Sequence, residues 1–407
     1  MTGEKVSVVI PTRDRPDTLA KSLLTVINQT HRNIEVIVSN NGNNPETNRV
    51  IEAIGDSRVR CVQPSASLSM SHNFEFAMQH ATGDLIALIG DDDGILPTGI
   101  ERAVAMMRES GAEALASVNC TFRWPIDQQS QQGVYLSVPM TSGWSWRDSR
   151  TVMRRVLERD LSFNEAPTTY TGGVISSQLY DRIKQVRGSF YQSQIPDTFS
   201  AFAFLSVTDR YILAHEPLMI AGVSGHSHGQ TALGVKSHSF NEDPNIPFHS
   251  DLPLPEEGRL TFSFQALLYE SYLQTQYLRT DNSLTTIKDQ VVATVAYAKA
   301  HRNWTKGGDK AYDACVRWAR TMAAHHNLDV QEIEEKAKRL SFAQASSQYR
   351  QTVRDFLTRY VIDDKIALNI SDVYQASIVA ESIRLTKPNR LHSYRRTFAR
   401  KIRKSIG

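Results

Sequence analysis

Three consecutive carboxylates, Asp91, Asp92 and Asp93, follow the apolar run Leu85–Ile89 and a single glycine, Gly90. A run this rich in Leu and Ile, closed by glycine, is typical of a buried strand. Adjacent negative charges repel one another, so water or a cation must compensate for them. Mg²⁺ and Mn²⁺ prefer carboxylate oxygens and keep coordination positions open for substrate phosphates. The triplet therefore predicts a metal-assisted phosphate site, and a solvated acidic turn is the alternative.

Strand-like and helix-like segments alternate around this triplet. Predicted strands lie at 6–10, 34–38, 59–62, 85–89 and 114–118, and predicted helices at 16–28, 46–54, 69–80 and 97–110. This alternation with short loops indicates βαβ units and a mostly parallel α/β sheet flanked by helices. Ligands of such sheets bind beyond the carboxyl ends of the strands. Three polar loops, Pro11–Arg15, Ser39–Gly42 and Gly90–Gly94, should therefore face one crevice.

These loops carry a resemblance to a known family. The segment Val8–Arg15 resembles the opening strand and loop of family 2 glycosyltransferases, which have the Rossmann-like GT-A fold. Glu35–Gly42 is similar to their second strand, and Asn73 and Ala81–Asp84 to the helix and turn before their metal strand. Gly90–Pro97 resembles their metal-binding DXD motif. The four matches stand in the same order and spacing as in that family.

The resemblance implies metal-dependent, inverting transfer of a sugar from a nucleotide diphosphate sugar, in the manner of a hexosyltransferase. The implied acceptor is a glycan or its lipid carrier in surface polysaccharide synthesis, and the implied cofactor is Mn²⁺ or Mg²⁺. Asp93 is the implied metal ligand, together with Asp91. The residues implied to bind the nucleotide sugar are Pro11, Thr12, Arg13, Asn40, Asn41, Asn73, Asp91 and Asp92.

Two positions depart from the family pattern. Asn40 and Asn41 stand where aspartate is commoner, and an amide can donate as well as accept a hydrogen bond. The nucleotide base therefore stays open. Gly90 occupies a place where the family often has aspartate.

An inverting transfer needs a base that takes the proton of the acceptor hydroxyl. The family places a carboxylate for this purpose at the start of a later helix, and Asp197, after Pro196, is the best match. A helix cap is the alternative role for Asp197. Glu165 and Asp160 are weaker candidates for the base.

Two further groups of residues could serve the same site. His226 and His228 lie in a glycine-rich loop that could give a third metal ligand or a lid, or simply be an exposed loop. Trp144 and Trp146 alternate, so both lie on one face of an extended segment. They could stack on an acceptor sugar, although core packing is the commoner role of tryptophan. Tyr170 could shape the same acceptor side.

The sequence predicts a division into three parts. Residues 1–240 form the glycosyltransferase domain, 241–258 a linker rich in proline and acid, and 259–407 a mainly α-helical domain. The helical domain could also form a homo-oligomer. Its tail, 388–407, has seven Arg and Lys and no acid from residue 390 to 404. Apolar residues at helical spacing there predict a basic amphipathic helix that could lie on an anionic membrane, or a frayed terminus.

The composition limits the class of protein. Of 407 residues, 41% are hydrophobic and 22% charged, which is ordinary for a globular protein. The net charge of +3 comes from the tail, so the body is not predicted to bind nucleic acid. Three cysteines without a CxxC motif fit a reducing compartment. With no signal peptide and no membrane span, we expect a cytoplasmic protein, which the tail could hold at the inner face of the membrane.

Three alternatives to a glycosyltransferase differ in the motifs that they require. A sugar nucleotidyltransferase would carry a glycine-rich loop after the first strand, and Pro11–Arg15 has no glycine. A dinucleotide oxidoreductase would need a GxGxxG motif there. A nucleotide-binding scaffold of a glycan-assembly complex remains open, although the intact triplet and Asp197 favour an enzyme.

Overall fold

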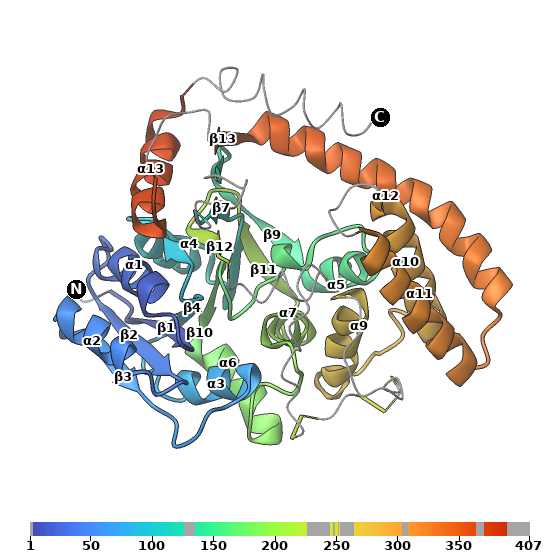
Figure 1. Cartoon of the computed structure of the whole chain (residues 1–407), viewed down its shortest axis with the longest axis horizontal. Coiled ribbons are helices and arrows are strands. Elements are labelled where there is room, and N and C mark those ends of the chain that lie inside the picture. The colour runs from blue at the N-terminus through green and yellow to red at the C-terminus, as the bar shows by residue number, and fades with distance from the viewer. Residues whose placement is uncertain are drawn as a thin grey trace.

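The computed structural model describes residues 3–125, 135–225, 245–246, 249–250, 252, 264–302, 308–363 and 370–388. Its centre is an eight-stranded sheet in the order β3-β2-β1-β4-β10-β6-β11-β9, and a five-stranded sheet has the order β13-β8-β7-β12-β5 (Figure 1). The strands of the large sheet are β1 Val6–Thr12, β2 Ile34–Asn40, β3 Val59–Val62, β4 Leu85–Leu88, β6 Ala114–Ser117, β9 Trp144–Asp148, β10 Gly173–Ser176 and β11 Arg210–Ala214. Those of the small sheet are β5 Gly94–Ile95, β7 Cys120–Arg123, β8 Tyr135–Pro139, β12 Met219–Val223 and β13 Arg359–Asp363.

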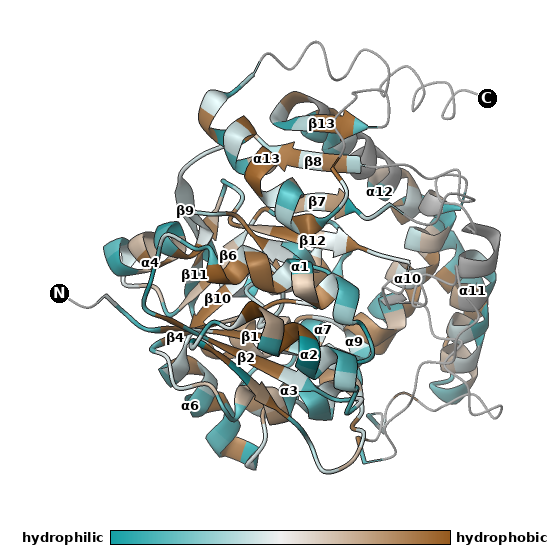
Figure 2. Cartoon of the chain, turned by 60° about the vertical axis from the view of Figure 1, so that its left-hand side comes forward, coloured by the Kyte–Doolittle hydropathy of each residue, from teal (hydrophilic) through white to brown (hydrophobic). Residues whose placement is uncertain are grey.

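Helices cover both faces of the large sheet. One face packs on α1 Pro16–Ile27, α2 Pro45–Ile54 and α4 Gly99–Ser110. The other packs on α3 Met70–Met78, α5 Ser149–Leu157, α6 Ser177–Arg187 and α7 Pro196–Val207. Strands covered on both faces need apolar residues at every position, which explains the continuous runs of the sequence. The brown strands of Figure 2 lie between helices whose outer surfaces are largely teal.

The predicted fold class is confirmed. Strands β1, β2, β3 and β4 pair in parallel, and β10 enters antiparallel between β4 and β6. The parallel register places Thr12 opposite Asn40, so the carboxyl ends of these strands lie at one edge of the sheet. This is the edge at which the sequence predicted the polar loops to meet.

The C-terminal part is mainly helical, as predicted. It contains α9 Phe264–Gln274, α10 Ile287–His301, α11 Gly308–His325, α12 Val330–Thr358 and α13 Val373–Thr386. Arg159 joins this part to the large sheet, because its buried guanidinium donates to the carbonyl oxygens of Leu157 and Gln265 and to Gln290 Oε1. Burial lowers the pKa of that guanidinium to about 10.

The end of the described chain returns to the N-terminal part. Strand β13 pairs antiparallel with β8, and Arg359 Nη2 donates to the carbonyl oxygen of Asn119 at 2.7 Å. Helix α13 packs on α1 and on the small sheet, burying Val373, Ala376 and Ala380 (Figure 1). These contacts cross the predicted boundary between 1–240 and 259–407, and that division stays a prediction.

Two predicted segments lie largely or wholly outside the described residues. These are the linker 241–258, of which five residues are described, and the basic tail, of which only Pro388 is described. In the part of the chain that the structure describes, no helix combines the length and apolar character needed to cross a bilayer.

Candidate active site

The aspartate triplet occupies the turn where the chain passes from the large sheet to the small one. β4 ends at Leu88 and β5 begins at Gly94, which places the three carboxylates in the connection between the two sheets. Strand β12 closes over this turn, and a Cβ atom on Gly222 would lie only 1.8 Å from the carbonyl oxygen of Asp92. Glycine is therefore needed at position 222, where two backbone segments touch.

Asp91 faces the loop after β1. Thr12 Oγ1 donates to Asp91 Oδ2 at 2.6 Å, and Arg15 Nη1 lies 3.2 Å from Asp91 Oδ1. Burial raises the pKa of Asp91 to about 6, although the charge of Arg15 opposes the shift. Burial also lowers the pKa of Arg15, but the charges of Asp91 and Asp92 outweigh it, so that pKa is raised overall.

Asp93 is held by three donors. Its Oδ2 accepts from the Gly90 N–H at 2.8 Å and from the Thr171 hydroxyl, and its Oδ1 accepts from the Gly222 N–H at 2.7 Å. Burial and the neighbouring charge of Asp92 raise the pKa of Asp93 to about 7.

Asp92 points toward the segment after β12, where Ser224 Oγ donates to its Oδ2 at 2.6 Å. The indole N–H of Trp124 donates to the Asp92 carbonyl oxygen at 2.8 Å. Together these contacts fix the backbone and the carboxylate of the central residue of the triplet.

The triplet fits a divalent cation. Three adjacent carboxylates are almost fully buried, and their desolvation favours any partner that brings positive charge. All of their donor atoms are oxygens, the type that Mg²⁺ and Mn²⁺ prefer. Within the described residues no three His, Cys, Asp or Glu side chains converge as a complete ligand set. The arrangement suits a cation that completes its shell with substrate phosphates.

Asp197 lies in the first turn of α7. The helix cap is Ile195, so Asp197 is not the capping residue, and its Oδ1 accepts from the N–H of Thr198 at 2.8 Å. Burial raises the pKa of Asp197 to about 6, and the hydrogen bonds from backbone N–H groups oppose the shift. A carboxylate with such a pKa can be ionised at neutral pH and still accept a proton.

The two rival carboxylates are occupied elsewhere. Glu165 Oε2 lies 3.9 Å from Arg147, and Asp160 accepts from Arg155 at 2.8 Å. Both pairs are at the end of the large sheet where β9 and α5 meet.

Tyr170 connects the triplet with Asp197. Burial raises the pKa of its phenol well above the usual value, and the charges of Asp93, Asp92, Asp91 and Asp197 raise it further. Next to it, the Thr169 N–H donates to Ser200 Oγ of α7 at 3.1 Å, so the loop of Tyr170 joins the helix that carries Asp197.

The three predicted asparagines hold loops at this edge of the sheet. Asn40 Nδ2 donates to the Asn44 carbonyl oxygen at 3.0 Å, and Asn41 exchanges two hydrogen bonds with the backbone of Leu68. Asn73 Oδ1 accepts from Ser39 Oγ at 2.6 Å. Their contact with a nucleotide stays a prediction.

Pro11 and Thr12 are buried, whereas Arg13 is exposed in the loop after β1.

Sequence reasoning missed Arg15, Thr171, Gly222 and Ser224, which all contact the triplet. Arg15 ends the same polar loop, and Ser224 lies beside the histidines of the glycine-rich segment, so both had a signal. Thr171 had none, because only folding brings it next to Asp93.

The tryptophans are not brought to this site. Trp144 and Trp146 lie on β9, the outermost strand of the large sheet, and pack against the core on the side of α4. The guanidinium of Arg210 stacks 4.0 Å from the Trp146 ring. These contacts favour the packing role over acceptor binding. His226 and His228 lie outside the described residues.

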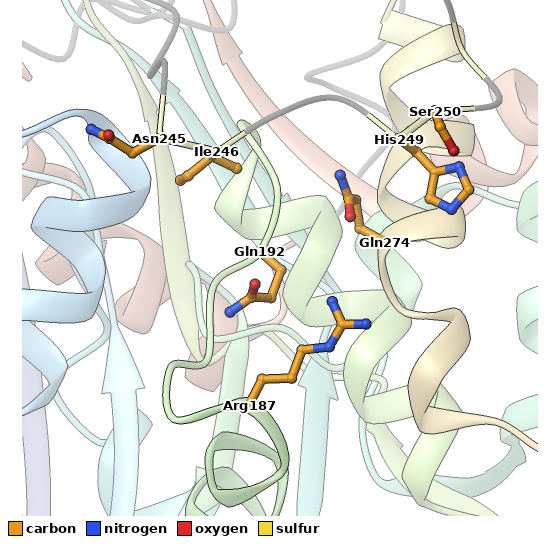
Figure 3. Close-up of a pocket in the computed structure, with 7 residues that line it drawn as sticks. All are labelled: Arg187, Gln192, Asn245, Ile246, His249, Ser250 and Gln274. Atoms are coloured by element: carbon orange, nitrogen blue, oxygen red, sulfur yellow. The ribbon is translucent and has the colours of Figure 1, made fainter.

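A cavity of about 270 Å³ lies beside the loop that leads into α7. Figure 3 shows Arg187 and Gln192 on one side and His249 and Gln274 on the other. Gln194, in the same loop, donates to the Ile246 carbonyl oxygen at 2.6 Å. The described lining residues, all polar except Ile246, are Arg187, Gln192, Asn245, Ile246, His249, Ser250 and Gln274.

Several curated proteins match the first part of the chain. Putative glycosyltransferase EpsE of Bacillus subtilis (strain 168) is 27% identical over 111 residues, 26% of this chain and 40% of that protein. The Escherichia coli UDP-Glc:alpha-D-GlcNAc-diphosphoundecaprenol beta-1,3-glucosyltransferase WfaP is 28% identical over 104 residues, 26% of this chain and 41% of that protein. The chain thus spans about two fifths of the length of these relatives.

A solved structure of S. aureus TarS 1-349 in complex with UDP-GlcNAc is similar at 12% identity and a TM-score of 0.46, over 80% of this chain and 93% of that one. This likeness is too distant to support a conclusion. The sequence profile of glycosyl transferase family 2 matches 7–167, which contains the triplet and all three polar loops. Residues 7–167 of this chain belong to glycosyl transferase family 2.

Proposed function

We propose that the protein transfers a sugar from a nucleotide diphosphate sugar to a hydroxyl group of a glycan or lipid-linked acceptor in surface polysaccharide synthesis. The observation that carries the proposal is the buried aspartate triplet at the carboxyl edge of the large sheet, with the loop of Tyr170 lying between it and α7, the helix of Asp197. Family 2 membership of 7–167 supports the donor class. The lipid-linked acceptor rests on the printed name of the E. coli relative, which acts on a diphosphoundecaprenol-linked sugar.

The reaction is a single displacement with inversion. Asp197 takes the proton of the acceptor hydroxyl. At the same time the oxygen of that hydroxyl bonds to the anomeric carbon of the donor sugar. The bond between that carbon and the diphosphate oxygen breaks, and the nucleotide diphosphate leaves with the electron pair. Mn²⁺ or Mg²⁺, held by Asp93 with Asp91 or Asp92, would supply charge compensation for this leaving group.

The acceptor should approach from the side of Asp197. Among the described residues, the cavity next to the loop before α7 offers amides, a histidine and Arg187. Such a lining suits hydroxyl groups and an anionic substituent, as a sugar linked to a diphosphate would present.

The basic tail, 388–407, would hold the protein at an anionic membrane where such an acceptor resides. Truncation after Pro388 should then abolish cosedimentation with anionic vesicles, and retained binding would exclude this role of the tail.

Calorimetric titration with UDP, GDP and dTDP, each with Mn²⁺ and then with EDTA, tests the donor site. We expect tight binding of one nucleotide, lost with EDTA and weakened by Asp93→Ala. Absence of binding for all three would contradict the proposal.

The variant Asp197→Asn tests the catalytic role. It should keep the affinity for the nucleotide and lower sugar transfer by roughly 10²–10⁴-fold, the usual contribution of a general base. Asp181→Asn, an exposed residue of α6, is the matched control and should transfer at the normal rate. Unchanged transfer by Asp197→Asn would favour a different base, and absence of transfer in the native protein would favour a nucleotide-binding scaffold.

A further inference from the structure

Gly90 and Tyr170 compete for the same space. A Cβ atom on Gly90 would lie 2.5 Å from the Tyr170 hydroxyl oxygen and 2.9 Å from Asp93 Oδ2. Gly90 is not among the glycines with positive φ, so its backbone does not require glycine. Glycine is needed at position 90 because the Tyr170 hydroxyl occupies the space that a side chain there would fill.

The loop Thr168–Gly173 fixes the ring of Tyr170. Thr168 Oγ1 accepts from the Tyr170 N–H at 3.1 Å and donates to the Tyr170 carbonyl oxygen at the same distance. A Cβ atom on Gly173 would lie 1.8 Å from the Thr168 carbonyl oxygen, so the loop closes tightly. The ring stacks on Phe74 of α3 with centroids 6.0 Å apart. The hydroxyl position is therefore set by the scaffold.

The hydroxyl of Tyr170 is available to a ligand. Among the described residues it makes no hydrogen bond, although the side chain is only partly exposed. The phenol O–H can therefore donate to an oxygen that arrives with the substrate. A hydroxyl group whose position is fixed by its loop and by ring stacking, and which has no protein partner, points to a substrate contact.

We propose that the Tyr170 hydroxyl donates a hydrogen bond to a hydroxyl oxygen of the sugar being transferred. In a displacement the transferred sugar lies between the leaving diphosphate and the attacking acceptor. The triplet marks the diphosphate end and Asp197 marks the acceptor end. The Tyr170 hydroxyl lies against Gly90 beside the triplet, and its neighbour Thr169 donates to Ser200 Oγ of α7. This inference rests on the proposed function, and it moves Tyr170 from the acceptor side to the donor sugar.

Binding of a nucleotide sugar and of its nucleotide isolates the contact with the sugar. The wild type, Tyr170→Phe and the control Tyr135→Phe would be titrated with UDP-glucose, UDP-GlcNAc and GDP-mannose, and with UDP and GDP, all with Mn²⁺. We expect Tyr170→Phe to weaken the preferred nucleotide sugar by about 3- to 10-fold, the usual contribution of one hydrogen bond, and to leave the nucleotide diphosphate unchanged.

Three outcomes would overturn the inference in different ways. If Tyr170→Phe binds the nucleotide sugar as the wild type does, the proposed hydrogen bond to the sugar is excluded and the proposed function is unaffected. Equal weakening of the nucleotide sugar and the nucleotide diphosphate moves the contact to the diphosphate. Failure of the wild type to bind any of the probes removes the proposed function and this contact with it.

The steric pair can be tested without a ligand. Gly90→Ala should destabilise the native protein and lower the midpoint of its denaturant unfolding, as overpacking does, because its Cβ displaces the hydroxyl. In the Tyr170→Phe background, which lacks that oxygen, the same substitution should cost clearly less. Equal losses in both backgrounds, measured by denaturant unfolding, would show that the two positions do not share one space.

Discussion

Asp197 lies in the first turn of α7, and Glu270 of α9 contacts the loop that leads into that helix. Glu270 Oε2 accepts from Ser193 Oγ at 2.5 Å. Burial raises the pKa of Glu270 to about 7, against the opposing hydrogen bond from Ser193. An ionised carboxylate is costly where it is desolvated, so the protonation of both residues should depend on pH in the range near neutrality.

The pKa of Asp197 predicts the acid limb of the activity profile. A base works only when ionised, and the ionised fraction of Asp197 falls about tenfold per pH unit below a pKa of about 6. Sugar transfer at saturating nucleotide sugar should therefore decline below pH 6. A rate that stays constant from pH 7 down to pH 5 would exclude Asp197 as the base.

Glu270→Gln should stabilise the protein at alkaline pH. The folded-state pKa lies above the ordinary value of 4.5, so the folded protein holds an extra proton and its free energy of unfolding falls as pH rises from about 4.5 to 7. The amide removes this loss, worth about 3 kcal/mol at pH 8 and nothing near pH 4. Urea unfolding at both pH values measures it, with the exposed Glu52→Gln as control. A gain of the same size at pH 4 would contradict the titration.

Residues inside motifs could be named from the sequence, and residues brought in by folding could not. Asp91, Thr12 and Asp197 follow from the polar loops and the family resemblance. Thr171 contacts Asp93 across 78 positions of the chain, and no local pattern announces such a pair. The alternation of Trp144 and Trp146 was visible, but strand alternation does not say at which edge of a sheet the strand will lie.

At the scale of elements, close approach of two backbone segments builds the site. Strand β12 donates its Gly222 N–H to Asp93 while its Cα passes over Asp92. The long apolar strands and the helices between them were predicted within a few residues, because their periodicity is strong. β5 has only two residues, and β13 follows directly on the long α12, so neither had a period to detect.

Gly222→Ala should disrupt the triplet. A Cβ atom 1.8 Å from a carbonyl oxygen forces one of the two segments to move, at a cost of about 1–3 kcal/mol or more. Metal-dependent nucleotide binding should be lost with it. Gly111→Ala is the control, because this glycine has φ +68° and no neighbour within 4 Å. The control variant should be destabilised by backbone strain and still bind the nucleotide normally. Normal binding by Gly222→Ala would show that β12 does not shape the site.

At the scale of the whole molecule, α13 fastens the small sheet to the rest. Its outer end carries a cluster in which Arg384 Nη2 lies 3.0 Å from Glu381 and Arg102 lies 3.6 Å from the same carboxylate. Thr98 Oγ1 also donates to Glu381 at 2.5 Å. The sequence predicted a helix here but assigned it to a separate domain, since periodicity reports a buried face and not its partner.

Ala380→Asp should therefore loosen the small sheet. Ala380 is fully buried against that sheet, and an unpaired charge there should cost several kcal/mol. Ser382→Asp, two positions along on the exposed face, is the matched control and should cost well under 1 kcal/mol beyond helix propensity. Thermal unfolding separates them. Similar melting temperatures for both variants would mean that α13 is not held where the structure has it.

The antiparallel pairing of β13 with β8 also sets an order in time. Residues 135–139 leave the ribosome more than 200 residues before 359–363, the strand that completes their sheet. Until then β8 presents an unpaired edge, which is open to pairing with other chains. The interval during which β8 can pair with another chain therefore lasts until residues 359–363 have been synthesised.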